Sequence, residues 1–199
     1  MPGQYKHLAR AFGAEGGHRI FFVTKHASAE IAGVTRITYG MPKLESPPPT
    51  HRYLATATRA VMQGQQVWRV CDQLQRREKF TPDIIVGHPG WGDMLFLKDL
   101  FPNAKILSFF EFYYRATGAD VGFEEAVKAD DYARIRTKNV TNLMSLEQAD
   151  WGMTPTVCQH SLHPNELKHK LSVLHDGVDV EICAPSAAAS YTFPNGKTL

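Results

Sequence analysis

Two side chains that can take part in acid–base chemistry each follow a short apolar run in this sequence. His88 comes after residues 84–86 in the stretch DIIVGHPGWGD (83–93), and Glu111 comes after residues 105–110 (KILSFF). An unperturbed imidazole titrates at about pH 6.5, so it can bind hydroxyl groups or a phosphate in either charge state. A carboxylate can accept a hydrogen bond or a proton from a hydroxyl group. We therefore take His88 and Glu111 as the candidate catalytic residues.

Glycines and an aromatic ring accompany His88. Gly90 and Gly92 would present backbone N–H groups at a turn where neither a strand nor a helix continues easily, and Trp91 would offer a flat apolar face. We expect all three residues to bind substrate. Two alternatives stay open: Trp91 could pack in the core, and His88 could be a structural histidine that backbone groups satisfy at the end of a strand.

Three further candidate binding residues follow Glu111. Tyr113 and Tyr114 would line a pocket, and the guanidinium of Arg115 could bind a phosphate or a carboxylate. The alternatives are an ion pair between Glu111 and Arg115 that holds the loop, and a core position for one of the two tyrosines.

The sequence around these residues is predicted to alternate between strands and helices. We expect strands at 18–24, 34–39, 83–86, 105–110, 151–154 and 171–174, and helices at 4–14, 51–79, 94–100, 130–148, 156–162 and after Pro164. Short connections between them predict a doubly wound α/β fold, a parallel sheet with helices on both faces. Ligands bind such sheets at the carboxyl edge of the strands, where His88 and Glu111 would lie.

Helical spacing predicts which side chains of the two longest helices point inward. In helix 51–79 the expected stripe consists of Leu54, Ala57, Val61, Gly64, Trp68 and Cys71, with Gly64 marking a bend. In helix 130–148, which Asp130 or Asp131 would cap, the inward residues are Ile135, Leu143 and Leu146.

Composition excludes several classes of protein. The 199 residues are 43% hydrophobic and carry a formal charge of +2, which gives no reason to expect nucleic-acid binding. No apolar run approaches the ~18 residues of a membrane span. The three cysteines are too widely spaced for a disulfide framework, and they favour a reducing cytosol. His160 and His163 lack a third ligand at suitable spacing, so we expect no metal site.

Four motifs occur in an order that resembles a known family. They are PGQYKHLA (2–9), GHPGWGD (87–93), FFEFYYR (109–115) and VLHDGVD (173–179). Together they resemble the N-terminal, acceptor-side half of family 4 glycosyltransferases, which are retaining enzymes built from two Rossmann-like domains in the GT-B architecture. The resemblance covers nearly the whole chain. It departs from the family at Glu111, where many relatives have a histidine after the equivalent strand.

The resemblance implies a function and a set of partners. It implies transfer of a sugar from a nucleotide-sugar donor, bound mainly by a C-terminal domain, to a sugar or lipid-linked acceptor, with no cofactor and no metal. Gly3 would let the backbone approach the donor phosphate. The implied location is cytoplasmic, with peripheral association at the inner membrane face as a further expectation.

The resemblance also implies a domain organisation. Residues 1–180 would form the Rossmann-like domain and residues 181–199 a linker toward the donor-binding domain. The family has a strand before the Gly3 loop that this sequence lacks, and an open strand slot would favour dimerisation. We expect this chain alone to bind acceptor without turnover.

Two other functions fit parts of the pattern. A non-catalytic module could bind a nucleotide or a phosphate at Gly3 and residues 87–92. A free-standing hydrolase could use Glu111 and His88, although no second carboxylate stands near them in the sequence.

Overall fold

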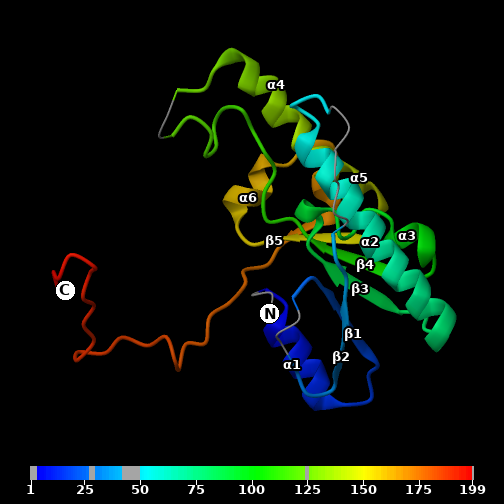
Figure 1. Cartoon of the computed structure of the whole chain (residues 1–199). Coiled ribbons are helices and arrows are strands. Elements are labelled where there is room, and N and C mark those ends of the chain that lie inside the picture. Colours follow the sequence, from blue (N-terminus) through cyan, green and yellow to red (C-terminus); the bar gives the residue numbers. More distant parts are fainter. Residues whose placement is uncertain (1–3, 27–29, 42–49, 124–125, 199) are drawn as a thin grey trace.

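All strands of the described chain run parallel, and they form two sheets (Figure 1). The computed structural model describes residues 4–26, 30–41, 50–123 and 126–198, so Gly3 lies outside the described residues. The first sheet pairs β1 (Ile20–Thr24) with β2 (Val34–Thr38). The second has the order β3 (Ile84–Gly87), β4 (Lys105–Phe109), β5 (Trp151–Thr154) and β6 (Leu171–Val173).

The predicted parallel α/β architecture is confirmed, and each predicted strand is found to within about two residues. The division into two sheets was not predicted from the strand pattern. Within the described ranges, β1 and β3 each pair along one edge only.

The helices that connect these strands largely follow the sequence pattern. They are α1 (Lys6–Glu15), α2 (Ala55–Glu78), α3 (Leu97–Leu100), α4 (Ala129–Thr137), α5 (Val140–Gln148) and α6 (Val157–Leu162), with short 3₁₀ helices η1 (Pro89–Trp91) and η2 (Asn165–Lys170). The prediction of one helix over 130–148 is wrong, because Lys138 and Asn139 interrupt the helix and separate α4 from α5. Asp130 and Asp131 lie in the first turn of α4 and do not cap it.

The main apolar core joins the two sheets through α2. Val67 and Cys71 of α2 pack with Tyr39, which follows β2, and with Ile106 of β4. Each large apolar side chain buried there contributes roughly 1.5–3 kcal/mol. Because α2 runs alongside both sheets (Figure 1), it holds them together without a shared strand ladder.

The inward faces of α2 and α5 differ from the predicted ones. Gly64 and Cys71 are buried as expected, but Leu54 and Val61 are 46% and 44% exposed. The buried row of α2 follows a spacing of three or four residues through Ala60, Gly64, Val67, Cys71 and Leu74. In α5, Leu143 is 41% exposed while Leu146 is 1% exposed. On both helices the observed buried face is therefore rotated relative to the predicted one.

Two glycines set the distance between α2 and the turn that follows β3. A Cβ atom on Gly64 would lie 2.6 Å from the carbonyl oxygen of Gly92, and one on Gly92 would lie 2.1 Å from the carbonyl oxygen of Ala60. Gly92 also has φ +97°, a conformation that glycine tolerates best. Gly64 thus allows close backbone packing within a continuous helix, and its predicted role in a bend stays a prediction.

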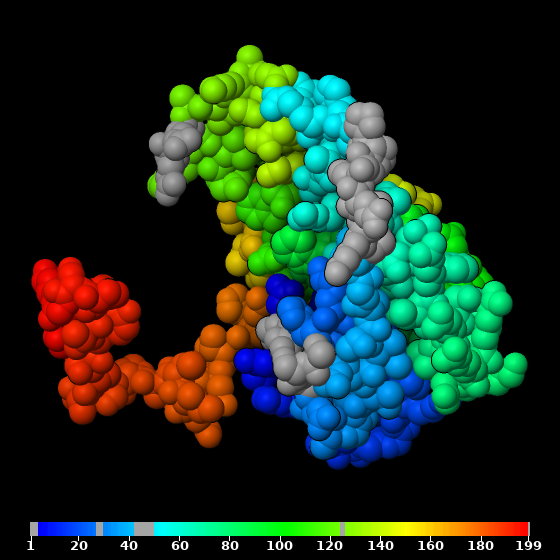
Figure 2. Space-filling view, in the orientation of Figure 1, coloured from blue at the N-terminus to red at the C-terminus, as the bar shows by residue number. Residues whose placement is uncertain are grey.

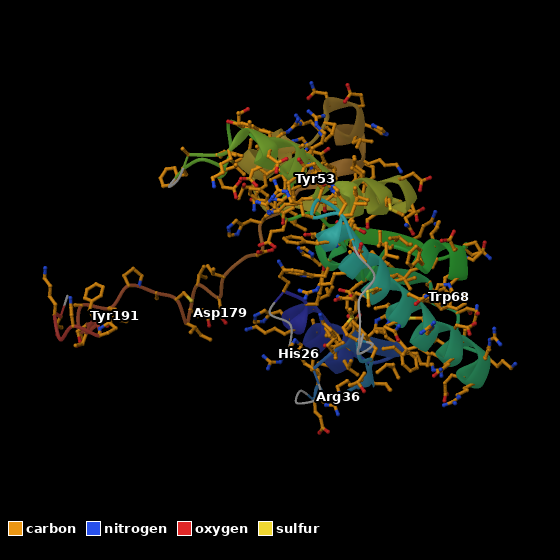
Figure 3. All side chains as sticks on the ribbon, turned by 45° about the horizontal axis from the view of Figure 1, so that its top comes forward. His26, Arg36, Tyr53, Trp68, Asp179 and Tyr191 are labelled. Carbon is orange, nitrogen blue, oxygen red and sulfur yellow. The ribbon has the colours of Figure 1, made fainter. Side chains whose placement is uncertain are left out.

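The chain after β6 leaves the folded body. Asp179 and Tyr191 lie far from the sheets (Figure 3), and one antiparallel bridge joins Thr192 to Thr198. Within the described ranges, no helix combines the length and the apolar character that a bilayer crossing requires.

Candidate functional site

His88 and Glu111 lie together at the carboxyl edge of the second sheet. β3 and β4 are adjacent parallel strands with Gly87 opposite Ser108, so the residues that follow them come to the same edge. His88 Nε2 lies 3.2 Å from Glu111 Oε2. The side chains are 17% and 53% exposed, respectively. The carboxylate is thus open to a ligand, while the imidazole lies behind it.

The turn after β3 determines which imidazole nitrogen faces Glu111. The Gly90 N–H donates to His88 Nδ1 over 3.0 Å. Nδ1 is therefore the acceptor in the neutral ring, and the proton resides on Nε2, which donates to Glu111. Glu111 Oε1 accepts no hydrogen bond from any described residue. This oxygen can accept a hydrogen bond from a hydroxyl group of a ligand.

Trp91 forms an exposed wall beside this pair. Its side chain is 67% exposed, so the alternative of a core position is wrong. The Trp91 and His88 rings are stacked with centroids 6.4 Å apart. Flat aromatic faces of this kind pack against apolar faces of ligands.

Gly90 and Gly92 shape the turn and do not offer free N–H groups. The Gly90 N–H is used by His88, and the Gly92 N–H donates to the Pro89 carbonyl oxygen over 3.0 Å. A Cβ atom on Gly90 would lie 2.8 Å from His88 Cε1. The predicted N–H contacts to a ligand from these two glycines are therefore not supported by the geometry.

The two tyrosines after Glu111 have different environments. Tyr113 is 8% exposed, which matches the alternative of a core position for one of them. Tyr114 is half-buried, and the Lys138 ammonium lies 4.8 Å from its ring centroid. Burial raises the pKa of the Tyr114 hydroxyl, and the carboxylates of Asp120 and Glu111 add to that effect. Tyr114 is therefore a neutral hydrogen-bond donor near the site.

Arg115 does not pair with Glu111. Its Nε donates to the Leu162 carbonyl oxygen over 2.6 Å, and its guanidinium lies over the Tyr113 ring at 5.2 Å. The alternative of a Glu111–Arg115 ion pair is therefore wrong. Arg115 therefore anchors the loop to α6.

Tyr5 is a polar residue near the site that the sequence pattern assigned only to a helix. Its hydroxyl is buried and has no hydrogen-bond partner among the described residues. Burial raises the pKa of this hydroxyl well above its usual range, and Asp176, Asp93 and Glu111 contribute further. No feature of the sequence distinguishes this tyrosine from a core residue of α1.

Asp93 links the two sheets at the same edge. Its Oδ1 accepts from the Tyr39 hydroxyl over 2.5 Å and from Gln63 Nε2 over 2.9 Å. Gln63 Oε1 accepts in turn from Lys25 Nζ over 2.9 Å. Burial, and then the hydrogen bond to Asp93, hold the pKa of Tyr39 well above its usual range. This polar network was not predicted from the sequence.

The other polar motifs are structural. Thr154 is fully buried, and Thr156 caps α6 by accepting from the Gln159 N–H over 3.2 Å. His163 is 1% exposed, and burial lowers its pKa. Across the described ranges, no cluster of three or more histidine, cysteine or acidic residues could hold a metal ion.

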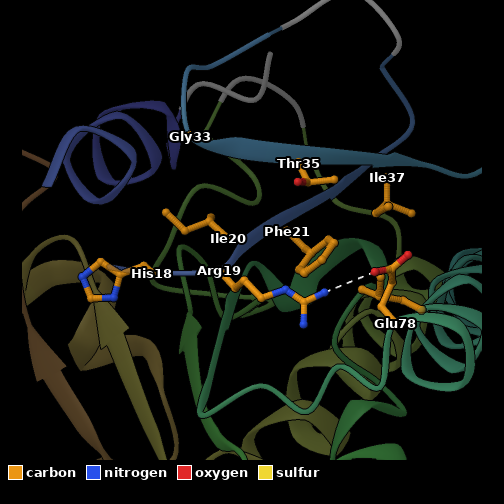
Figure 4. A pocket seen from close by; sticks show the side chains of 9 residues that line it. His18, Arg19, Ile20, Phe21, Gly33, Thr35, Ile37 and Glu78 are labelled. Carbon is orange, nitrogen blue, oxygen red and sulfur yellow. Dashed lines mark hydrogen bonds and ion pairs between the residues drawn. The ribbon is translucent and has the colours of Figure 1, made fainter. Parts of the chain in front are cut away.

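A separate pocket of about 310 Å³ lies at the amino ends of β1 and β2, against the end of α2 (Figure 4). The Arg19–Glu78 ion pair spans it at 3.3 Å. It contains neither His88 nor Glu111. Figure 2 shows the segment that follows β6 extending away from the folded body.

Comparison with known protein families gives a match over most of the chain. The model of a family described as the glycosyl transferase family 4 group matches residues 16–183. No curated protein matches the sequence. The matched residues include β1 to β6 and the His88–Glu111 pair.

Proposed function

Because the chain belongs to the glycosyl transferase family 4 group, we propose that its residues 1–180 form the acceptor side of a retaining glycosyltransferase that uses a nucleotide-sugar donor. Family membership supports glycosyl transfer. The observation that supports the assignment of the acceptor site is the His88–Glu111 pair, with an unshared carboxylate oxygen beside the exposed Trp91 ring.

The pair suggests a role for each side chain. The attacking hydroxyl of the acceptor donates a hydrogen bond to Glu111 Oε1, while His88 holds the other carboxylate oxygen. The bond between the sugar C1 and the diphosphate breaks, and the bond to the acceptor oxygen forms on the same face. Glu111 takes the acceptor proton as the new bond forms, and the diphosphate departs as the anion. Trp91 packs against the C–H face of a sugar ring.

In this proposal the donor binds to a second domain, and the linker that leads to this domain begins at residue 181. An exposed apolar residue closely follows the carboxyl end of each of three strands, β3, β5 and β6. These residues are Trp91 (67%), Val157 (73%) and Leu174 (58%). Exposed apolar residues gathered at one edge are typical of a surface that meets another domain. In this proposal the present chain binds acceptor and does not turn over alone. Dimerisation and a cytoplasmic or peripheral location stay predictions.

Substitution of Glu111 tests this function. In the complete enzyme, Glu111→Gln keeps the shape of the side chain and removes its charge, and we expect the transfer rate to fall by about 10²-fold or more. The control is Glu147→Gln, because Glu147 is an exposed carboxylate on α5 with no side-chain contact to the site. Release of nucleoside diphosphate from a panel of nucleotide sugars measures the rate, and NMR of the product gives the anomeric configuration. Unchanged transfer by Glu111→Gln would overturn the assignment.

A further inference from the structure

The loop that carries Glu111 continues past β4 without a neighbouring strand. The Phe110 N–H donates to the Met153 carbonyl oxygen over 2.7 Å, and this is the last backbone bond of that ladder. Within the described chain, the backbone of residues 111–115 forms no hydrogen bond to another backbone group. Unpaired backbone in a half-buried segment needs other partners, because each unsatisfied group costs ~1–3 kcal/mol.

Two buried asparagine side chains supply those partners. Asn139 Oδ1 accepts from the Tyr114 N–H over 2.8 Å, and Asn139 Nδ2 donates to the Tyr114 carbonyl oxygen over 2.8 Å. Asn142 Nδ2 donates to the Phe112 carbonyl oxygen over 2.9 Å. Both asparagines are 4% exposed. The amide of Asn139 thus forms the same cyclic pair with Tyr114 that a neighbouring strand would form.

On α5, one of these amides is buried while an adjacent apolar side chain stays exposed. Asn142 is buried at 4% exposure, while the adjacent Leu143 is 41% exposed. Asparagine is a poor helix former, and a buried amide without partners is unfavourable. A helix selected only for core packing would therefore bury Leu143. The break between α4 and α5 falls at Asn139, where it brings the amide level with Tyr114.

We propose that Asn139 and Asn142 are positioning residues for glycosyl transfer, which hold the loop so that Glu111 stays beside His88. This inference rests on the proposed function of the His88–Glu111 pair. The amides fix the backbone on the Tyr114 side of Glu111, and the β4 ladder fixes it at Phe110. Glu111 itself is half-exposed and has no other side-chain contact that would hold it.

The test compares variants of one helix in the complete enzyme. Asn139→Ala and Asn142→Ala remove amides that contact the loop. Gln148→Ala removes an amide at the other end of α5. This amide donates to the Leu95 carbonyl oxygen over 2.6 Å and forms no hydrogen bond with residues 111–115. We expect the two asparagine variants to lower the turnover number at least tenfold with little change in KM for the donor. Gln148→Ala should stay within about twofold of wild type. Because all three variants lose amide hydrogen bonds of similar strength, a difference in turnover reports the contact with the loop.

A second readout does not depend on activity. Diethyl pyrocarbonate acylates neutral imidazole side chains, and peptide mass spectrometry locates the product. Loss of the Glu111 contact exposes His88 Nε2, so labelling of His88 should rise in Asn139→Ala toward the level of Glu111→Ala. Labelling of His169, which lies on η2, should not change. Should Asn139→Ala fail to fold, Asn142→Ala carries the test, because it removes only the single hydrogen bond to the Phe112 carbonyl oxygen.

The outcomes separate the two proposals. If Glu111→Gln transfers normally while Asn139→Ala still raises His88 labelling, the catalytic role of Glu111 is wrong and the positioning of the loop stands. If Glu111→Gln is inactive while the asparagine variants match Gln148→Ala in both turnover and labelling, the positioning inference is overturned.

Discussion

Gly92→Ala tests how tightly the turn that carries His88 is packed against α2. The added Cβ would lie 2.1 Å from the Ala60 carbonyl oxygen and 2.6 Å from its carbonyl carbon. These atoms belong to the interior of a continuous helix and cannot rotate away. The substitution also places a side chain at φ +97°.

The expected loss of stability has two parts. A left-handed backbone costs an ordinary residue about 1–2 kcal/mol. Forcing an extra methyl group into a packed contact costs typically about 1–3 kcal/mol. Together they predict a decrease of about 2–5 kcal/mol in the free energy of unfolding, a large part of the ~5–15 kcal/mol of an ordinary domain.

Gly118→Ala is the matched control, because Gly118 has φ +73° and a Cβ atom there would meet nothing within 4 Å. It should lose only the backbone contribution, about 1–2 kcal/mol. Urea unfolding followed by tryptophan fluorescence measures both variants. Equal losses in the two variants would show that the contact between α2 and the turn is not tight, and would refute the packing argument.

Two further measurements test the electrostatics and the core. Hydrogen bonds, first from Lys98 Nζ and then from the Ile106 N–H, hold the pKa of Asp150 well below its usual range. The contribution of Asp150 to stability is therefore complete when the pH is above the pKa that this side chain has in the unfolded chain. The stability difference between wild type and Asp150→Asn should therefore narrow as the pH falls below about 4, and an equal difference at pH 3 and pH 7 would contradict this. Burial raises the pKa of the Cys71 thiol to about 12, whereas the other two cysteines are exposed. A thiol reagent at pH 8 should modify two thiols rapidly and the third only in denaturant; three rapid reactions would show that the core around Cys71 is open.

The carboxyl-edge rule explains why the candidate pair could be predicted from the sequence. His88 and Glu111 each end an apolar run, and those runs are consecutive in the chain. Consecutive strands in parallel α/β folds are commonly neighbours, so the two residues meet at one edge. The register of Gly87 with Ser108 is what turns that expectation into a contact of 3.2 Å.

The partners of the loop could not be predicted in this way. Arg115 donates to the Leu162 carbonyl oxygen, a backbone atom that any residue at that position would supply. No glycine or proline marks the helix break before Asn139. The side chain of Asn139 bonds to Tyr114 and not to its own helix, so the usual capping signal is also missing. Such contacts depend on where α5 and α6 lie, and local periodicity carries no information on that.

The division of the strands into two sheets has a consequence for cooperativity. Within the described ranges no strand ladder joins β1 to β3, so the first sheet can separate without breaking a backbone hydrogen bond of the second. Side-chain contacts oppose that separation, among them the apolar contacts of α2, the Arg19–Glu78 ion pair and the chain of hydrogen bonds from Lys25 through Gln63 to Asp93. We therefore expect the two sheets to open as distinct units, with amide exchange in β1 governed by a smaller opening free energy than exchange in β4.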